Sequence, residues 1–369
     1  MTRILVLSLL VACSGGGGDD DKGGGGNNGG GGGTGTDTAT TSGRTDSGPT
    51  DDTGHTGAID TVVRTDSGRA VITDRYLQAS PAAVDLLFVI DDSCSMGPRQ
   101  AELAEAFPSF MNYLLGSGID YHIGVTSTSV TSQAASCNVG NALDGRLAEV
   151  QGIKWIDPDT PDPTQVFSQL ALLGDGGSGC EQGLGAAKRA LDDRANGANA
   201  GFLRDEAELH TVVLSDEEDQ TENQIVQLQD FISWYQGLKA DPDHTHFHSF
   251  VCTTPGVVGG YGAGCFTDTI GDRYLSVTDA VGGTVVDILE LDDAAIEGLG
   301  LSTAGLARSF VLSATPVDGT IEVEVLLAKL LLELDEGNEW FFDASANSVV
   351  FIDYVPDPGA EVVIRYVAQ

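Results

Sequence analysis

The sequence predicts an α/β fold with a doubly wound, mostly parallel sheet, preceded by a disordered tether and followed by a small antiparallel β domain. Two segments rich in Val, Leu, Ile and Phe, residues 84–90 and 210–215, are typical of strands buried on both faces, and each is followed by an acidic residue. Segments with apolar residues at helical spacing alternate with such strands, which indicates a sheet covered on both faces. Beyond residue 308 apolar and charged residues alternate instead, as in antiparallel strands with one wet face.

The elements of the α/β region follow one another in a regular order. The helix after the first strand is predicted by apolar residues that recur at helical spacing, namely Leu103, Phe107, Phe110 and Leu114. The second strand is expected at residues 121–126, and a third, near 147–153, is expected to pair antiparallel with it. The later elements are a helix around 184–191, a strand at 210–215, a helix at 225–235, strands at 246–252 and 286–289, and a closing helix at 292–306.

Residues 305–369 are expected to form a small β-sandwich-like domain. Residues 321–325 alternate apolar with charged side chains, Val362, Ile364 and Tyr366 recur at every second position, and Pro-Asp-Pro-Gly at 356–359 marks a turn between strands. The run Leu330-Leu331-Leu332 is too short to span a membrane, so we expect it to be a core strand of this domain.

The beginning of the chain has the pattern of an export signal. Arg3 supplies a positive charge, residues 4–11 are apolar, and Leu10-Val11-Ala12-Cys13 follows, which is similar to the lipobox of bacterial lipoproteins. The similarity implies a signal peptide over residues 1–12 and acyl chains on Cys13 that hold the protein on a lipid bilayer. Ser14 after the cysteine is typical of Gram-negative lipoproteins sorted to the outer membrane. The alternative is an ordinary signal peptide with a chance cysteine.

Residues 13–70 are rich in Gly, Thr, Ser and Asp and contain few large apolar residues. Such a segment cannot bury enough surface to offset its chain entropy, so a disordered tether is expected there. The whole chain carries 55 acidic and 18 basic residues, a formal charge of −37. This charge argues against nucleic acid or an anionic membrane surface as a partner.

Five cysteines remain if Cys13 carries lipid, and an exported protein is expected to oxidise them. Cys252 and Cys265 flank a glycine-rich loop and are the first expected pair. Cys94 and Cys180 both lie in loops expected to carry metal ligands, and a bond between them would join those loops. Cys137 is a competing partner for either pair, and the sequence leaves the connectivity open.

Oxygen-bearing side chains follow the two buried strands. Asp91-x-Ser93-x-Ser95 follows the first strand, and Asp216 follows the strand at 210–215. Carboxylate and hydroxyl oxygens are ligands of hard divalent cations, and parallel strands end at one edge of the sheet. The alternative to a metal site is that these Asp and Ser residues only cap helices.

Asp91, Ser93, Ser95 and Asp216 resemble the metal-ion-dependent adhesion site of von Willebrand factor type A (vWA) domains. The resemblance covers about residues 82–300, and it implies a vWA domain, Rossmann-like in fold, over residues 80–304. It also implies a bound Mg²⁺ or Ca²⁺, with Mn²⁺ as a further possibility. A threonine of the family's second loop is replaced here by Ser178, which keeps the hydroxyl; Glu181 and Asp175 are the alternative ligands.

A second candidate site lies in Asp243-His244-Thr245-His246-Phe247-His248. In a strand, His244, His246 and His248 share one face and could bind Zn²⁺ or Ni²⁺. We favour the alternative of an exposed polar strand face, because the sequence shows no clear fourth ligand.

The functional expectation is binding rather than catalysis. The sequence contains no nucleotide-binding P-loop and no nucleophile elbow, and none of its six histidines lies near the Asp and Ser motifs. In adhesive vWA domains the cation accepts a carboxylate from a protein partner, and the resemblance implies the same here. We therefore expect an envelope lipoprotein, facing the periplasm or the cell surface, that acts in adhesion or complex assembly. The alternatives are a metal-dependent hydrolase and a structural protein with a purely stabilising metal.

Overall fold

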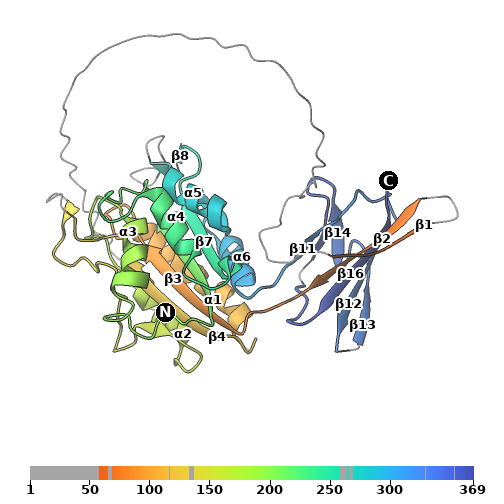
Figure 1. The fold of residues 1–369 in the computed structure, drawn as a ribbon, viewed down its shortest axis with the longest axis horizontal. Coiled ribbons are helices and arrows are strands. Elements are labelled where there is room, and N and C mark those ends of the chain that lie inside the picture. Colours follow the sequence, from red (N-terminus) through yellow and green to blue (C-terminus); the bar gives the residue numbers. More distant parts are fainter. Residues whose placement is uncertain are drawn as a thin grey trace, which may run out of the picture. The chain divides into compact units, whose positions relative to one another are not determined.

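The computed structural model describes residues 58–64, 69–115, 117–132, 137–257, 264–265, 269–328, 330–352 and 354–369. The expected signal peptide, Cys13 and most of the expected tether lie outside the described residues. The described chain contains an α/β part and an all-β part (Figure 1). Among the described residues no helix is both long and apolar enough to cross a bilayer.

The α/β part is built on a six-stranded sheet in the order β10-β7-β6-β3-β4-β5. All neighbouring strands run parallel except β5, which pairs antiparallel with β4. This is the doubly wound sheet that the sequence predicts. Its strands are β3 (Ala83–Ile90), β4 (Asp120–Ser127), β5 (Trp155–Ile156), β6 (Glu208–Ser215), β7 (Thr245–Val251) and β10 (Val285–Asp287).

Helices cover both faces of this sheet, because alternate strand residues point to opposite faces. Leu86 and Phe88 of β3 pack with α1 (Gly97–Leu114), α2 (Pro163–Ala171) and α6 (Asp293–Thr303). Leu87 and Val89 pack on the other face with α3 (Gly183–Lys188), α4 (Leu228–Gln236) and α5 (Asp272–Val281). Every residue of β3 is buried, including the charged Asp85.

Two details of the α/β part differ from the sequence prediction. The antiparallel edge strand is Trp155–Ile156 and not residues 147–153, which contribute only an isolated bridge between Val150 and Ile153. Helix α2 was not expected. Its Phe167 stacks on Phe107 of α1 (ring centroids 3.4 Å apart), so it completes the aromatic core on that face.

The all-β part consists of two packed sheets, as expected of a sandwich-like domain. One has the order β1-β2-β16-β12-β13 and the other the order β11-β15-β14. They share a core that includes Val325, Trp340, Phe351 and Ile364. The strands are β1 (Ala58–Arg64), β2 (Ala70–Leu77), β11 (Ser309–Val311), β12 (Glu322–Leu327), β13 (Leu330–Leu334), β14 (Trp340–Asp343), β15 (Ser348–Phe351) and β16 (Glu361–Val367); a separate hairpin joins β8 (Gly256–Val257) to β9 (Gly264–Cys265).

The boundaries expected for the β domain and the tether are corrected by β1 and β2. These strands precede the α/β part in the chain, yet β2 pairs with β16 along its whole length. The β domain is therefore assembled from both sides of the α/β part and is not confined to residues 305–369. Strand β1 also lies inside the segment 13–70 assigned to the tether, so the folded chain begins at least as early as Ala58.

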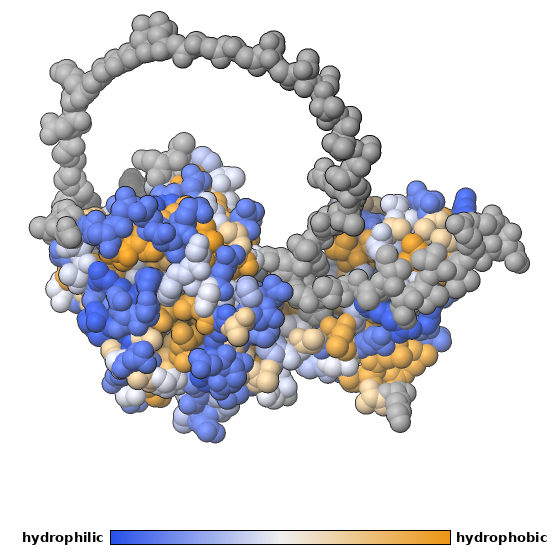
Figure 2. Space-filling model, viewed as in Figure 1, coloured by the Kyte–Doolittle hydropathy of each residue, from blue (hydrophilic) through white to orange (hydrophobic). Residues whose placement is uncertain are grey.

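The expectation that Leu330-Leu331-Leu332 forms a core strand is wrong. These residues lie in β13 at the edge of the five-stranded sheet, and their side chains are 62%, 47% and 41% exposed. Figure 2 shows hydrophobic surface over this part of the β domain. An apolar run alone cannot distinguish a central strand from an edge strand, because neighbours in the sheet decide burial.

Candidate metal centre

The carboxyl ends of β3 and β6 lie side by side where the strand order of the sheet reverses. β3 has β4 on one side and β6 on the other. Ligands of open α/β sheets bind outside the carboxyl ends of the strands at such a point. The backbone N–H of Asp91 donates to the oxygen of Leu214 (2.9 Å), which joins the two strand ends.

Four of the five predicted ligands come together here. Asp91 Oδ1 accepts a hydrogen bond from the backbone N–H of Ser93 (2.8 Å), so the carboxyl group stabilises the turn at residues 91–93. The hydroxyls of Ser93 and Ser95 lie 3.3 Å apart, and Ser95 Oγ donates to Asp216 Oδ1 (3.0 Å). The structure thus gathers two carboxyls and two hydroxyls from loops that are 121 residues apart in sequence.

Ser178, the fifth predicted ligand, uses its hydroxyl within neighbouring loops. Ser178 Oγ donates to the backbone oxygen of Cys137 (2.8 Å) and accepts from the N–H of Cys180 (3.0 Å). Its own N–H donates to Ser129 Oγ (2.9 Å), which in turn donates to Asp92 Oδ1 (2.7 Å). Ser178 is therefore connected to the first loop through Ser129 and Asp92, and its role as a ligand stays a prediction.

Glu181, one of the two alternatives to Ser178, is fully buried at the centre. Its Oε2 accepts from Gln220 Nε2 (3.0 Å), whereas its Oε1 is buried without a hydrogen-bond donor. Burial, the charges of Asp91 and Glu217 and a hydrogen bond with the Glu217 side chain raise the pKa of Glu181 to about 10. A cation bound among these carboxyl groups would stabilise their ionised forms. Asp175, the other alternative, is exposed.

The surroundings of the predicted carboxyl ligands also disfavour their ionised forms. Burial, with a smaller contribution from the charge of Asp216, raises the pKa of Asp91 to about 7 against the hydrogen bonds from Ser215 and Ser93. Burial also raises the pKa of Asp216, against the hydrogen bond from Ser95 and the charge of Arg99. A divalent cation would reverse this balance, because it stabilises the ionised carboxylates. The donor set of carboxylate and hydroxyl oxygens fits Mg²⁺ or Ca²⁺.

Several residues that support the site were missed from the sequence. Ser215 Oγ donates to Asp91 Oδ2 (2.6 Å), so the last residue of β6 orients the first ligand. Gln100 Nε2 donates to the backbone oxygens of Asp91 (2.8 Å) and Gly174 (2.9 Å), which ties the first loop to the glycine-rich loop. Ser215 could have been predicted, because it is a polar residue at the end of an apolar strand. Gln100 gave no signal, because its partners are distant in sequence.

Gly177 lets the glycine-rich loop approach the first loop closely. Its N–H donates to the oxygen of Asp92 (2.7 Å), and a Cβ at this position would lie 2.3 Å from Asp92 Cγ. We expect Gly177→Ala to separate the loops and to lower the free energy of unfolding by about 1–3 kcal/mol, measured by urea denaturation. Gly176→Ala is the matched control, because a Cβ at Gly176 meets nothing within 4 Å. Equal stability of the two variants would contradict this role of Gly177.

The disulfides confirm one expected pair and correct the other. Cys252 is bonded to Cys265, as expected from their positions around the glycine-rich hairpin. Cys180 is bonded to Cys137 and not to Cys94. The bond therefore joins the loop of Ser178 to the segment after β4, and it does not join the two loops that carry the predicted ligands.

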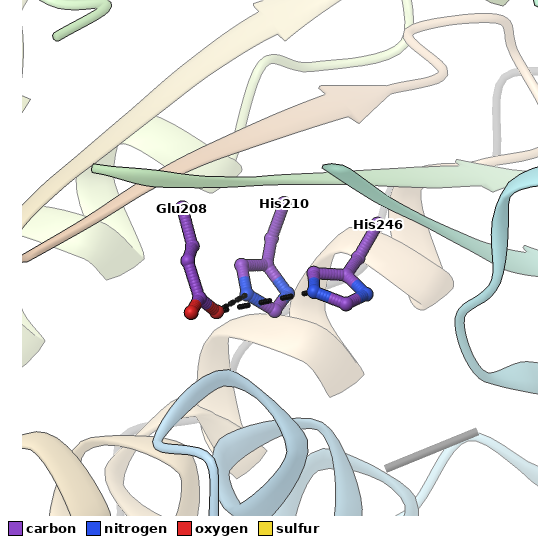
Figure 3. A group of neighbouring side chains, drawn as sticks. All are labelled: Glu208, His210 and His246. Atoms are coloured by element: carbon purple, nitrogen blue, oxygen red, sulfur yellow. Dashed lines mark ion pairs between the residues drawn. The ribbon is translucent and has the colours of Figure 1, made fainter. Parts of the chain in front are cut away.

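The predicted histidine group is rearranged. His246 lies beside Glu208 and His210 of the neighbouring strand, with its Nε2 3.9 Å from Glu208 Oε2 (Figure 3). His248 is fully buried and lies against His210. The exposed polar strand face favoured from the sequence is wrong, because the half-exposed His244 lies in a short 3-10 helix before β7, whereas His246 and His248 of the strand are mostly or fully buried.

The strand order, with its reversal beside the Asp-x-Ser-x-Ser loop, is that of a doubly wound, Rossmann-like sheet. Similar solved structures include a von Willebrand factor type A protein from Catenulispora acidiphila, with 17% identity over 82% of this chain and 61% of that chain and a TM-score of 0.37. Another is the pilus adhesin SpaC from Lactobacillus rhamnosus GG in its open conformation, with 10% identity over 83% of this chain and 41% of that chain and a TM-score of 0.39.

A third similar structure is proximal thread matrix protein 1 from the mussel byssus, with 7% identity over 64% of this chain and 51% of that chain and a TM-score of 0.36. The chain thus spans between about two fifths and three fifths of the length of these proteins. No protein-family model matches the sequence, and comparison with curated proteins gives no match.

Proposed function

We propose that this vWA-like protein binds a protein partner through a divalent cation at the carboxyl edge of its sheet. The observation that carries the proposal is that buried Asp91 and Asp216 lie beside half-buried Ser95, with the buried carboxyl of Glu181 within reach of the charge of Asp91. Oxygen ligands of this kind take Mg²⁺ or Ca²⁺ and leave coordination positions for water or for a further carboxylate. A partner that offers an Asp or Glu side chain would occupy such a position.

The residues around the carboxyl groups support binding rather than catalysis. A metal-dependent hydrolase needs a general base beside an open metal position, and histidine is the commonest such base. The histidine closest in sequence to a predicted ligand is His210, six residues before Asp216. His210 and His246 lie near the amino-terminal ends of β6 and β7, and His248 lies in the middle of β7. The carboxyl edge therefore supports recognition of a partner.

The proposal includes attachment to the cell envelope. The lipobox-like Leu10-Val11-Ala12-Cys13 supports an acylated Cys13 in the outer membrane, and the glycine-rich residues that follow support a tether of considerable reach. Radiolabelled palmitate incorporated by the full chain but not by Cys13→Ser would support the anchor. Equal labelling of the two would contradict it.

A partner pull-down from envelope extracts tests the function. The immobilised chain is expected to retain its partner in Mg²⁺ and to release it when EDTA is added. Asp91→Asn, which preserves the size of the side chain and its turn, is expected to retain none under either condition. A partner held equally in EDTA would contradict metal-dependent binding. A melting temperature lowered by EDTA, with no effect on the partner, would instead indicate a purely stabilising metal.

A further inference from the structure

Strand β13 of the β domain has a neighbouring strand on one side only. It pairs with β12, and in the part of the chain that the structure describes no strand lies on its other side. Three consecutive leucines of this edge strand, Leu330, Leu331 and Leu332, are between 41% and 62% exposed. Hydrophobic surface gathers over this part of the domain (Figure 2). β13 therefore offers an unpaired backbone edge and apolar side chains to a further strand.

β13 lacks the features that usually keep edge strands from pairing. Natural proteins protect such strands with bulges, proline or several charges. The opposite edge strand of the same sheet, β1, has an irregular register between Ile59 and Thr61. β13 instead keeps a continuous register with β12 and contains no proline, and Glu333 is its one charged residue. Its regular backbone can accept another antiparallel strand.

The leucines of β13 lie where the core of the β domain ends. Leu332 is directly opposite Val325 of β12, and Leu334 is directly opposite Val323. Opposite residues share a face of the sheet, and both valines are buried in the core. Leu330 points to the same face, because it precedes Leu332 by two residues. Leu330 and Leu332 are nevertheless exposed, so a second apolar strand beside β13 would continue the core.

We propose that β13 pairs antiparallel with β13 of a second copy of this chain, about a two-fold axis at Leu332. In this register Leu332 meets its own copy and Leu330 meets Leu334, so leucines alone join the core faces of the two domains. On the other face Leu331 meets Glu333, which keeps the two glutamates from lying opposite each other. The edge strand is thus complementary to itself.

The charges at the two ends of the strand also favour a second copy as the partner. In the sequence Lys329 precedes the strand and Asp335 follows it. The antiparallel register brings residue 329 of each copy opposite residue 335 of the other, so opposite charges meet twice. The formal charge of −37 repels two copies, but such repulsion is largely screened beyond about 8 Å at physiological ionic strength. A two-fold pair uses both β13 edges, so the assembly ends at a dimer.

Sedimentation velocity of the full chain over a concentration series, at physiological ionic strength, tests the proposal. We expect a reversible monomer–dimer equilibrium that Leu332→Lys weakens by at least about tenfold, because two lysines would face each other in place of two leucines. Leu330→Lys, at the most exposed of the three leucines, should also weaken it. Leu77→Lys is the matched control, because Leu77 is 57% exposed but lies in β2, away from this edge.

Circular dichroism checks that each variant is folded. The dimer should form equally in Mg²⁺ and in EDTA, since β13 takes no part in the proposed cation site. A dimer lost in EDTA would indicate a cation bridge between copies and would overturn the proposal. A chain that stays monomeric at every concentration, or that assembles beyond the dimer, would overturn it too. So would folded Leu332→Lys and Leu330→Lys variants that dimerise as strongly as Leu77→Lys.

Discussion

Asp91→Asn is expected to weaken Mg²⁺ or Ca²⁺ binding by at least about a hundredfold, because it removes the carboxylate charge from the centre of the proposed site. The substitution keeps an acceptor oxygen for the N–H of Ser93 and a polar partner for Ser215. The fold should therefore survive, and the loss should appear in binding alone. Isothermal calorimetry of the two folded proteins, with Mg²⁺ and with Ca²⁺, measures the difference.

Glu181→Gln tests the contribution of the Glu181 charge to cation binding separately from its contribution to the fold. With its pKa raised to about 10, Glu181 is protonated at neutral pH in the absence of a cation, so glutamine resembles its resting state. We expect unchanged stability in EDTA and cation binding about tenfold weaker, since one ionisable carboxyl is lost. Binding unaffected by both Asp91→Asn and Glu181→Gln would exclude this edge of the sheet as the cation site.

Asp74→Ala is expected to lower the free energy of unfolding of the β domain by about 2–4 kcal/mol, because it removes a buried acceptor of several hydrogen bonds. Asp74 lies in β2 and is 1% exposed. It accepts from the hydroxyl of Tyr366 (2.9 Å) in β16, and from the N–H (3.0 Å) and hydroxyl (2.6 Å) of Ser313. Urea denaturation followed by tryptophan fluorescence measures the change, since Trp340 lies in the core of this domain.

Tyr366→Phe is the graded control, because it removes one of these donors and leaves the others. Its cost should be smaller, about 1–2 kcal/mol. If Asp74→Ala were no more costly than Tyr366→Phe, β2 would contribute little to the β domain. Its pairing with β16 would then be marginal.

The strands of the α/β part were predictable because their signal is local. A strand buried on both faces is rich in large apolar residues, and residues 86–90 of β3 and 212–214 of β6 have that pattern. The grouping of Asp91 with Asp216 was predictable for a related reason, since parallel strands end at one edge. Helix α2 and the exposure of Leu330-Leu331-Leu332 were not predictable in this way, because they depend on packing neighbours distant in the chain.

The sequence by itself determined the doubly wound sheet, the loop that carries Asp91, Ser93 and Ser95, and the position of Asp216. Each follows from residue type and spacing within one strand and the loop after it. Only the tertiary structure decided that β1 and β2 complete the C-terminal β domain and that Glu181 lies buried beside Asp91. It also decided that His246 meets Glu208 and His210. Contacts of this kind depend on which strands become neighbours, and that choice is made by the packing of the whole chain.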